Sequence, residues 1–229
     1  MNTLLLRFRA PMQAWGISAK FDRRSTERVP SKSAVIGMIA GALGRKRDMS
    51  VDDLCALRFG VRIDREGILM RDFQTAKSAS DAYISHRYYL ADAAFLVGLE
   101  GAHEKLEAID FALKHPVYPI FFGRRSCSPE GRVSLGIRTM CLMDALKSEP
   151  RLTADKEGDE KVRFVLDATA DEEETYLLRD DPVSFNQHQR KFKFRRVLDI
   201  RDYTNFPNTE NFSHEPETEF DAMSGLEEA

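Results

Sequence analysis

Cysteine is scarce in this sequence. The 229 residues include only three, Cys55, Cys127 and Cys141, and none of them belongs to a CxxC pair. An odd number of widely spaced cysteines argues against a disulfide framework and against a zinc knuckle. Unpaired thiols are usual in the reducing cytoplasm, which is therefore the compartment that we expect.

Long apolar runs are also missing. The longest, residues 93–99, is far too short to cross a bilayer. The N-terminus has no basic stretch before its apolar residues and no small-residue cleavage site, so we expect no secretory signal and no membrane contact. Hydrophobic residues make up 42% and charged residues 31%, which is typical of a globular protein with a charged surface.

Sequence motifs typical of enzymes are also missing. The five histidines do not stand at metal-ligand spacing from acids or cysteines, and no GxSxG, HExxH or GxGxxG is present. A lone histidine is more often structural than catalytic. We therefore predict no catalytic residue, no metal site and no cofactor.

The net charge of −3 hides two positive regions. Residues 202–229 carry −8 with no Lys or Arg, which leaves +5 on residues 1–201. Residues 1–50 hold ten basic residues against three acidic ones, and a second basic run, RKFKFRR, covers residues 190–196. Local fields of this kind favour nucleic-acid binding, although solvated surface charge is the alternative that the sequence leaves open.

Hydrophobic periodicity predicts alternating strands and helices. Ser31 and Gly44 frame one helix as its N-cap and its C-terminal stop. The other expected helices are 50–57, 103–115 and 139–146, and the expected strands are 3–9, 59–63, 68–73, 88–99, 117–122, 162–167 and 194–201.

This order predicts an α+β, ferredoxin-like (RRM-like) fold with helices on one face of an antiparallel sheet. We expect a ferredoxin-like domain at 1–147, a small C-terminal β element at 148–203 and an acidic tail at 204–229. Residues 74–85 are polar and small, as in a mobile arm or the tip of an extended hairpin.

Two segments near the N-terminus could bind RNA. Lys32 and Ser33 open the first helix, where backbone N–H groups and the helix dipole favour a phosphate. Gln13 and Trp15 follow the first strand, where an amide and a ring can read and stack unpaired bases. An ordinary helix cap and a core tryptophan are the structural alternatives.

Two later segments combine arginine with glycine or tyrosine. Gly123 precedes Arg124, Arg125 and Ser126, which could grip phosphates beside a sharp turn, or could form an ordinary surface turn. Residues 86–89, HRYY, join the polar arm to a strand. Arginine beside tyrosine suits base stacking, and a core tyrosine with an exposed ion pair is the alternative.

Six segments of the sequence, several of them described above, resemble those of a known protein family. PMQAWG (11–16), VPSKSAVIGMIAGALG (29–44), DFQT (72–75), RYYLADAAF (87–95), PVYPIFFGRRSC (116–127) and DPVSFNQHQRKFKFRRV (181–197) occur in this order. Together they resemble the CasD-like subunits of the type I-E CRISPR Cascade complex, which belong to the RAMP superfamily. The resemblance runs from about residue 3 to about residue 200.

The resemblance implies a noncatalytic RNA-binding subunit that takes part in antiviral defence. Such subunits hold the 5′ handle of the CRISPR RNA and cap a backbone of CasC-like subunits. They also contact a CasA-like large subunit, and so meet target DNA through the complex. The resemblance further implies a thumb, which would cover about residues 73–87 here. By this resemblance, the residues expected to bind RNA are Gln13, Trp15, Arg28, Lys32, Ser33, Arg87, Tyr89, Arg124, Arg125 and Ser126.

A second function stays open from the sequence: metal-independent cleavage of CRISPR repeat RNA, as in related type I-C subunits. That reaction needs a His or Tyr to deprotonate a 2′-hydroxyl and a cation to stabilise the phosphate. His86, Arg87, Tyr88 and Tyr89 could supply these groups. The beginning of the chain resembles type I-E subunits instead, where a separate CasE-like subunit cuts.

Overall fold

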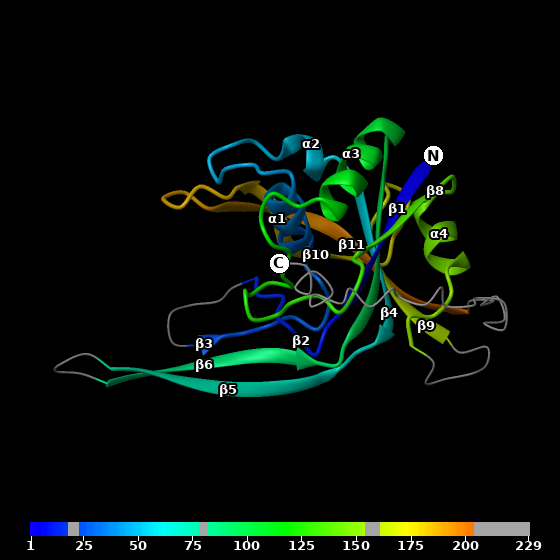
Figure 1. Cartoon of the computed structure of the whole chain (residues 1–229). Helices are drawn as coiled ribbons and strands as arrows, with labels where there is room; N and C mark the ends of the chain where they lie inside the picture. Colours follow the sequence, from blue (N-terminus) through cyan, green and yellow to red (C-terminus); the bar gives the residue numbers. More distant parts are fainter. Residues whose placement is uncertain (18–22, 78–81, 154–160, 204–229) are drawn as a thin grey trace, which may run out of the picture.

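The central feature of the fold is an antiparallel sheet of seven strands. We describe a computed structural model, in which residues 1–17, 23–77, 82–153 and 161–203 are placed. The strands follow the spatial order β10-β11-β9-β4-β7-β1-β8, and every pair is antiparallel (Figure 1). Their bounds are β1 (Asn2–Arg9), β4 (Arg58–Arg65), β7 (Ala94–Gly101), β8 (Ser134–Arg138), β9 (Lys161–Asp167), β10 (Thr175–Ser184) and β11 (Lys191–Tyr203).

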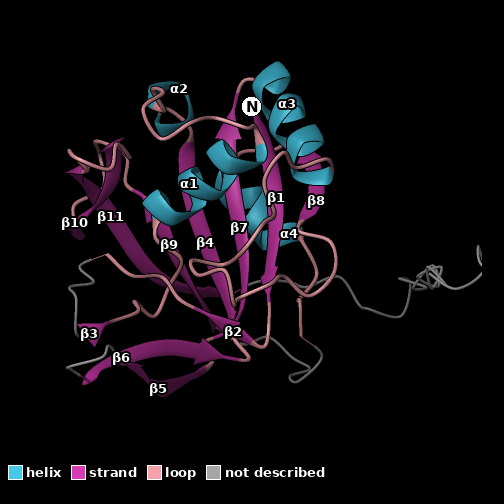
Figure 2. Ribbon diagram, turned by 60° about the vertical axis from the view of Figure 1, so that its left-hand side comes forward, coloured by secondary structure: helices cyan, strands magenta, loops and turns pink. Residues whose placement is uncertain are grey.

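Helices cover both faces of this sheet. Helices α1 (Lys32–Ala42) and α3 (His103–Lys114) lie on one face, and the short α2 (Asp52–Cys55) lies near β10 (Figure 2). Their core is built from side chains such as Leu4, Ile36 and Leu106, all fully buried. The prediction of mixed α and β structure built on an antiparallel sheet is confirmed, and the structure contains two sheets.

Helix α4 (Leu142–Ser148) corrects the expectation that all helices share one face. It packs on the opposite face, where Leu142 and Leu146 join Leu5 and Leu96 in a second apolar cluster. Two strand glycines let the helix come close: a Cβ at Gly98 would stand 2.5 Å from a Leu142 methyl carbon. The β1 pattern has buried residues on both of its faces, which is what a sheet covered twice requires.

The first helix ends as its sequence predicts. Gly44 has φ +73°, a left-handed conformation that suits glycine. The Gly44 and Arg45 N–H groups donate to the carbonyls of Gly41 and Ala40, which closes the helix in a Schellman motif. At the other end Ser31 is the N-cap, but its side chain makes no capping hydrogen bond.

A second, smaller sheet contains the polar arm. Strands β5 (Ile68–Lys77) and β6 (Ala82–Ala91) form a long antiparallel hairpin that projects from the body (Figure 1). Strands β2 (Met12–Gln13) and β3 (Arg23–Arg24) pair with the other edge of β6, and β3 does so in parallel.

The two sheets are joined at two turns. Gly67, with φ +73°, lies in the turn between β4 and β5, which enter different sheets and do not pair. The single strand predicted at 88–99 is wrong: it divides into β6 and β7 at Asp92, which has φ +54°. Continuous apolar sequence concealed this break because both strands are largely buried there.

The strand predicted at 117–122 is also wrong. Pro119 interrupts that segment and offers no N–H to a ladder, and the chain passes through it without regular structure. The edge strand beside β1 is β8 instead, and it contains Gly136 with φ +90°. Strand alternation alone did not reveal so irregular a strand.

The C-terminal strands continue the central sheet. Strand β9 pairs with β4 over Gly60–Ile63, so the β element predicted at 148–203 adds to the sheet of residues 1–147. The boundary at residue 148 stays a prediction, and the acidic tail at 204–229 lies outside the described residues. Among the described residues, no helix is both long and apolar enough to span a membrane.

Candidate nucleic-acid interface

Three arginines from separate parts of the chain gather at strand β6. Arg24 of β3 is the register partner of Arg87 on β6, so the two side chains leave the same face of the small sheet. Tyr89, two residues further along β6, shares that face. Arg124 lies over the Tyr89 ring, with its guanidinium carbon 4.5 Å from the ring centre. We call Arg24, Arg87, Tyr89 and Arg124 the arginine platform.

Two platform arginines keep unused hydrogen-bond donors. Arg124 Nη2 donates to the Arg24 carbonyl at 2.8 Å, but its buried Nη1 has no partner among the described residues. The buried Nε of Arg87 has none there either. Buried donors in folded proteins are normally satisfied, so these two nitrogens are exceptions among the described residues.

The Gly123 turn holds Arg124 in position. Gly123 has φ +87°, and a Cβ there would stand 1.6 Å from the Ala14 carbonyl oxygen. The Ala14 N–H donates to Phe122 at 3.1 Å, and Phe122 N–H donates to Cys127 at 2.8 Å. Gly123 therefore makes the predicted sharp turn, and its backbone closely approaches another segment of the same chain.

The opposite face of β6 carries a second arginine–tyrosine pair. Arg23 lies with its guanidinium carbon 5.2 Å from the centre of the Tyr88 ring, and it is the register partner of His86. Residues 11–30 have no hydrophobic periodicity, so their pattern does not single out Arg23 or Arg24. The density of basic residues in the first 50 was the one available signal.

Gln13 and Trp15 lie in the interior. Gln13 is fully buried, and its Nε2 donates to the Phe8 and Ala93 carbonyls at 3.2 and 2.7 Å. Trp15 is 1% exposed and stacks on Phe8 with ring centres 5.4 Å apart. A ring so deeply covered offers no face to a base, so the structure places both side chains where the structural alternative put them.

Lys32 and Ser33 are buried as well, and the helix start is already occupied. The Lys32 N–H donates to an oxygen of Asp180 at 2.8 Å, so a carboxylate of the chain holds the position that we predicted for a phosphate. Lys32 Nζ lies 2.8 Å from Asp167, and Ser33 is 8% exposed. Neither residue presents a free group to RNA in this structure.

The two aspartates complete a buried network with Arg195. Its guanidinium bonds Asp180 at 2.6 and 3.0 Å and Asp167 at 2.8 Å, which balances two cations against two carboxylates. Buried charges are tolerated only when they are paired in this way. Arg195 belongs to the basic run 190–196, which the sequence had led us to read as a single positive region.

Three predicted residues remain on the surface. Arg28, Arg125 and Ser126 are exposed, and Arg125 and Ser126 directly follow Arg124 of the platform. Of the ten predicted residues, the structure thus brings Arg87, Tyr89, Arg124, Arg125 and Ser126 to one region. Tyr89 is 5% exposed there, as the core-tyrosine alternative predicts, and Gln13, Trp15, Lys32 and Ser33 are buried as well.

The carboxyl group of Glu27 is less acidic than usual. Glu27 precedes Arg28, and its N–H donates to the Trp15 carbonyl at 3.0 Å. Burial raises the pKa of the Glu27 carboxyl above its ordinary value, and the nearby negative charge of Asp180 raises it further.

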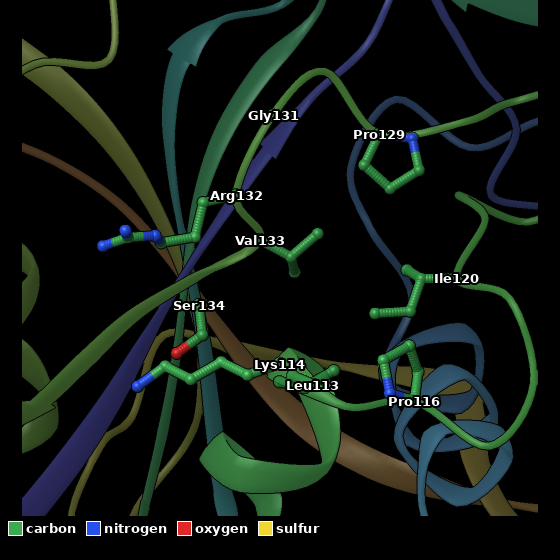
Figure 3. Close-up of a pocket in the computed structure, with 9 residues that line it drawn as sticks. All are labelled: Leu113, Lys114, Pro116, Ile120, Pro129, Gly131, Arg132, Val133 and Ser134. Carbon is green, nitrogen blue, oxygen red and sulfur yellow. The ribbon is translucent and has the colours of Figure 1, made fainter. Parts of the chain in front are cut away.

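One hollow in the described part of the chain lies away from these residues. It measures about 420 Å³ and lies between the end of α3 and the segment that enters β8, where Leu113, Ile120 and Val133 line it (Figure 3). None of the predicted residues belongs to its wall. Within the described ranges, no group of three or more His, Cys, Asp or Glu side chains is placed to hold a metal ion.

Comparisons with known proteins agree on one family. The family model described as CRISPR-associated protein (Cas_Cas5) matches residues 3–198. The CRISPR system Cascade subunit CasD of Escherichia coli (strain K12) is 36% identical over 149 residues, which are 54% of this chain. The aligned part spans 66% of that relative, slightly less than two thirds of its length.

Solved structures extend the likeness to most of the fold. A structure described as "Crystal structure of Cas protein" has 39% identity and a TM-score of 0.72, and the match covers 88% of this chain and 95% of that chain. A structure described as "CRISPR RNA-guided surveillance complex" has 28% identity and a TM-score of 0.76, and the match covers 88% and 90%. With the family match running through both sheets and the arginine platform, the chain belongs to the family CRISPR-associated protein (Cas_Cas5).

Proposed function

We propose that this chain is a noncatalytic subunit of a Cascade surveillance complex and that its arginine platform holds the 5′ handle of the CRISPR RNA. The observation that carries this proposal is that Arg24, Arg87 and Arg124 gather at Tyr89, with the Arg124 guanidinium over the tyrosine ring. Unpaired RNA exposes phosphates and bases together, and arginine on an aromatic ring can contact both. The relatives described as CasD and as an RNA-guided complex support this role.

We infer that the unit β1–α1–β4–β7–α3–β8 is ferredoxin-like. Its chain order is βαββαβ, and its strands lie in the order β8-β1-β7-β4, which supports that class. We also infer that the β5–β6 hairpin is the thumb, with bounds wider than the predicted 73–87. CasC-like and CasA-like subunits are the protein partners that this role implies, and the cytoplasm is its compartment.

The test is a titration of the purified chain with fluorescein-labelled single-stranded repeat RNA at several salt concentrations. We expect binding that weakens with salt, because each neutralised phosphate contributes about 0.7 to the slope of log K against log salt for single strands. Replacing both Arg124 and Arg125 by Ala should weaken binding and lower the slope. Absence of binding, or a slope that does not change, would contradict the proposal.

Partners are tested by native mass spectrometry of the tagged chain purified from its own cells. CasC-like and CasA-like proteins and a short RNA should accompany it. Catalysis is tested by incubating the chain with labelled repeat RNA in EDTA, where we expect no product. A discrete product that His86→Ala abolishes would replace our proposal by an endoribonuclease.

A further inference from the structure

We propose that the turn between β10 and β11, residues 184–191, is a second contact for the same single-stranded RNA and receives an unpaired nucleotide. The inference rests on the proposed function and extends it to a surface that the platform does not include. The turn carries Arg190 and Lys191 of the basic run 190–196, whereas Lys193, Arg195 and Arg196 of that run bind groups of the fold.

Charge makes the turn suited to phosphate. No Asp or Glu occurs between residues 182 and 198. Arg190 and Lys191 are exposed, and neither has a carboxylate partner among the described residues. Lys193, the next cation along β11, lies 3.3 Å from Asp181 and is thereby partly neutralised. The uncompensated charge is concentrated at Arg190 and Lys191.

Shape and polarity make the turn suited to a base. A hollow of about 420 Å³ is lined by Val183, Ser184, Asn186, His188, Gln189 and Lys191. Volumes above about 300 Å³ are typical of small-ligand sites. Asn186 Oδ1 accepts the His188 N–H at 3.0 Å, which leaves the Asn186 amide nitrogen and the Gln189 amide to meet a base edge. Amide side chains pair well with adenine.

Position connects this turn to the arginine platform. The chain runs from Arg24 past the exposed Arg28 to Lys32, where the Lys32 N–H binds Asp180 of β10. Phe185 then packs against Gly37 of α1, with a ring carbon 3.4 Å from the Cβ position. The β10–β11 and β5–β6 hairpins extend on the same side of the molecule in both views (Figures 1 and 2). Arg28 is an exposed cation in the segment that links the two contacts along the chain.

The experiment compares two pairs of charge deletions in the full chain. R190A/K191A removes the cations of the turn, and K46A/R47A removes an equally exposed Lys–Arg pair after α1 as the matched control. With labelled single-stranded repeat RNA, we expect the turn variant to bind about tenfold more weakly, with a slope lower by about 1.4 for two lost phosphate contacts. The control should bind like the unchanged chain.

A second pair of measurements separates base contact from charge. N186A/Q189A should weaken binding and leave the slope unchanged, because amides carry no charge. RNA containing 4-thiouridine, cross-linked by light, should attach to a peptide that includes residues 184–191. Equal affinity and slope in R190A/K191A and K46A/R47A, together with no cross-link at the turn, would overturn the inference.

The outcomes also distinguish this inference from the proposed function. If the unchanged chain binds RNA and R124A/R125A weakens it while R190A/K191A does not, the turn proposal fails and the platform stands. If the unchanged chain binds no RNA, the proposed function fails first. Loss of a protein partner from the native complex of R190A/K191A, with RNA affinity intact, would identify the turn as a protein contact instead and would refute our assignment.

Discussion

The guanidinium carbon of Arg124 lies 4.5 Å from the centre of the Tyr89 ring, while its Nη2 donates to the Arg24 carbonyl. This pairing joins a loop after the third helix to two strands of the small sheet. Cation–π contacts contribute about 0.5–2 kcal/mol depending on burial. The arginine is therefore held in place before any RNA arrives, which reduces the entropy that binding must overcome.

Arg124→Ala should weaken RNA binding and lower its salt slope by about 0.7, because one phosphate contact is lost. Arg124→Lys keeps the charge but loses the planar group, so it should bind weakly with a slope close to that of the unchanged chain. Both are measured by fluorescence anisotropy across salt concentrations, with Arg47→Ala as the exposed control. If Arg124→Ala has the same salt slope as the unchanged chain, Arg124 does not contact a phosphate of the RNA.

Lys32→Met should lower the free energy of unfolding by about 3–5 kcal/mol, because it leaves Asp167 and Asp180 buried with only Arg195 as a cation. Urea unfolding measures the loss, and the exposed Lys46→Met should change it by less than about 0.5 kcal/mol. The salt slope of RNA binding should stay the same. A lower slope in a variant of normal stability would show instead that Lys32 binds phosphate.

Gly123→Ala should cost more stability than Gly136→Ala. Both glycines have φ near +90°, but an added Cβ at Gly136 meets only the end of Arg138 at 3.6 Å, whereas at Gly123 it meets the Ala14 backbone at 1.6 Å. Backbone strain alone should cost about 1 kcal/mol at each site, and the clash adds to it only at Gly123. Trp15, the single tryptophan, stacks beside Phe122 and should report the change in its fluorescence. If Gly123→Ala and Gly136→Ala lower the stability equally, the close approach of Gly123 to the Ala14 backbone is contradicted.

Cys55 should react slowly with alkylating reagents in the folded chain. Burial, reinforced by the charge of Asp181, raises the pKa of the Cys55 thiol to about 11. Since only the thiolate reacts, roughly one molecule in a thousand is reactive at pH 8, and the rate should rise about tenfold per pH unit up to pH 10. Iodoacetamide labelling followed by peptide mass spectrometry measures the rate. Urea-unfolded protein, with an ordinary thiol, is the control, and equal rates in the two states would refute the shift.

The sequence pattern predicted the strands and helices correctly where their formation depends on residues close together in the chain. The first strand, the helix between Ser31 and Gly44 and the helix after Ala102 follow from periodicity and end signals. The motifs around Arg87 and Arg124 also marked the surface that the structure assembles. Local pattern failed where a distant segment decides: Pro119 and the irregular β8 left the edge strand of the sheet undetected, and Asp92 divided an apolar run into two sheets.

The amino-acid sequence by itself determined the mixed α/β class, most helices, the family resemblance and the presence of basic and aromatic motifs, because these depend on residue type, order and spacing. Only the tertiary structure decided which motif residues reach solvent. Lys32 is buried because Asp167 and Asp180 arrive from the far C-terminal strands, and Arg124 becomes a binding candidate because Tyr89 and Arg24 are folded beneath it. Whether a Lys or Arg side chain contacts solvent or a carboxylate depends on which residues lie near it in the folded chain.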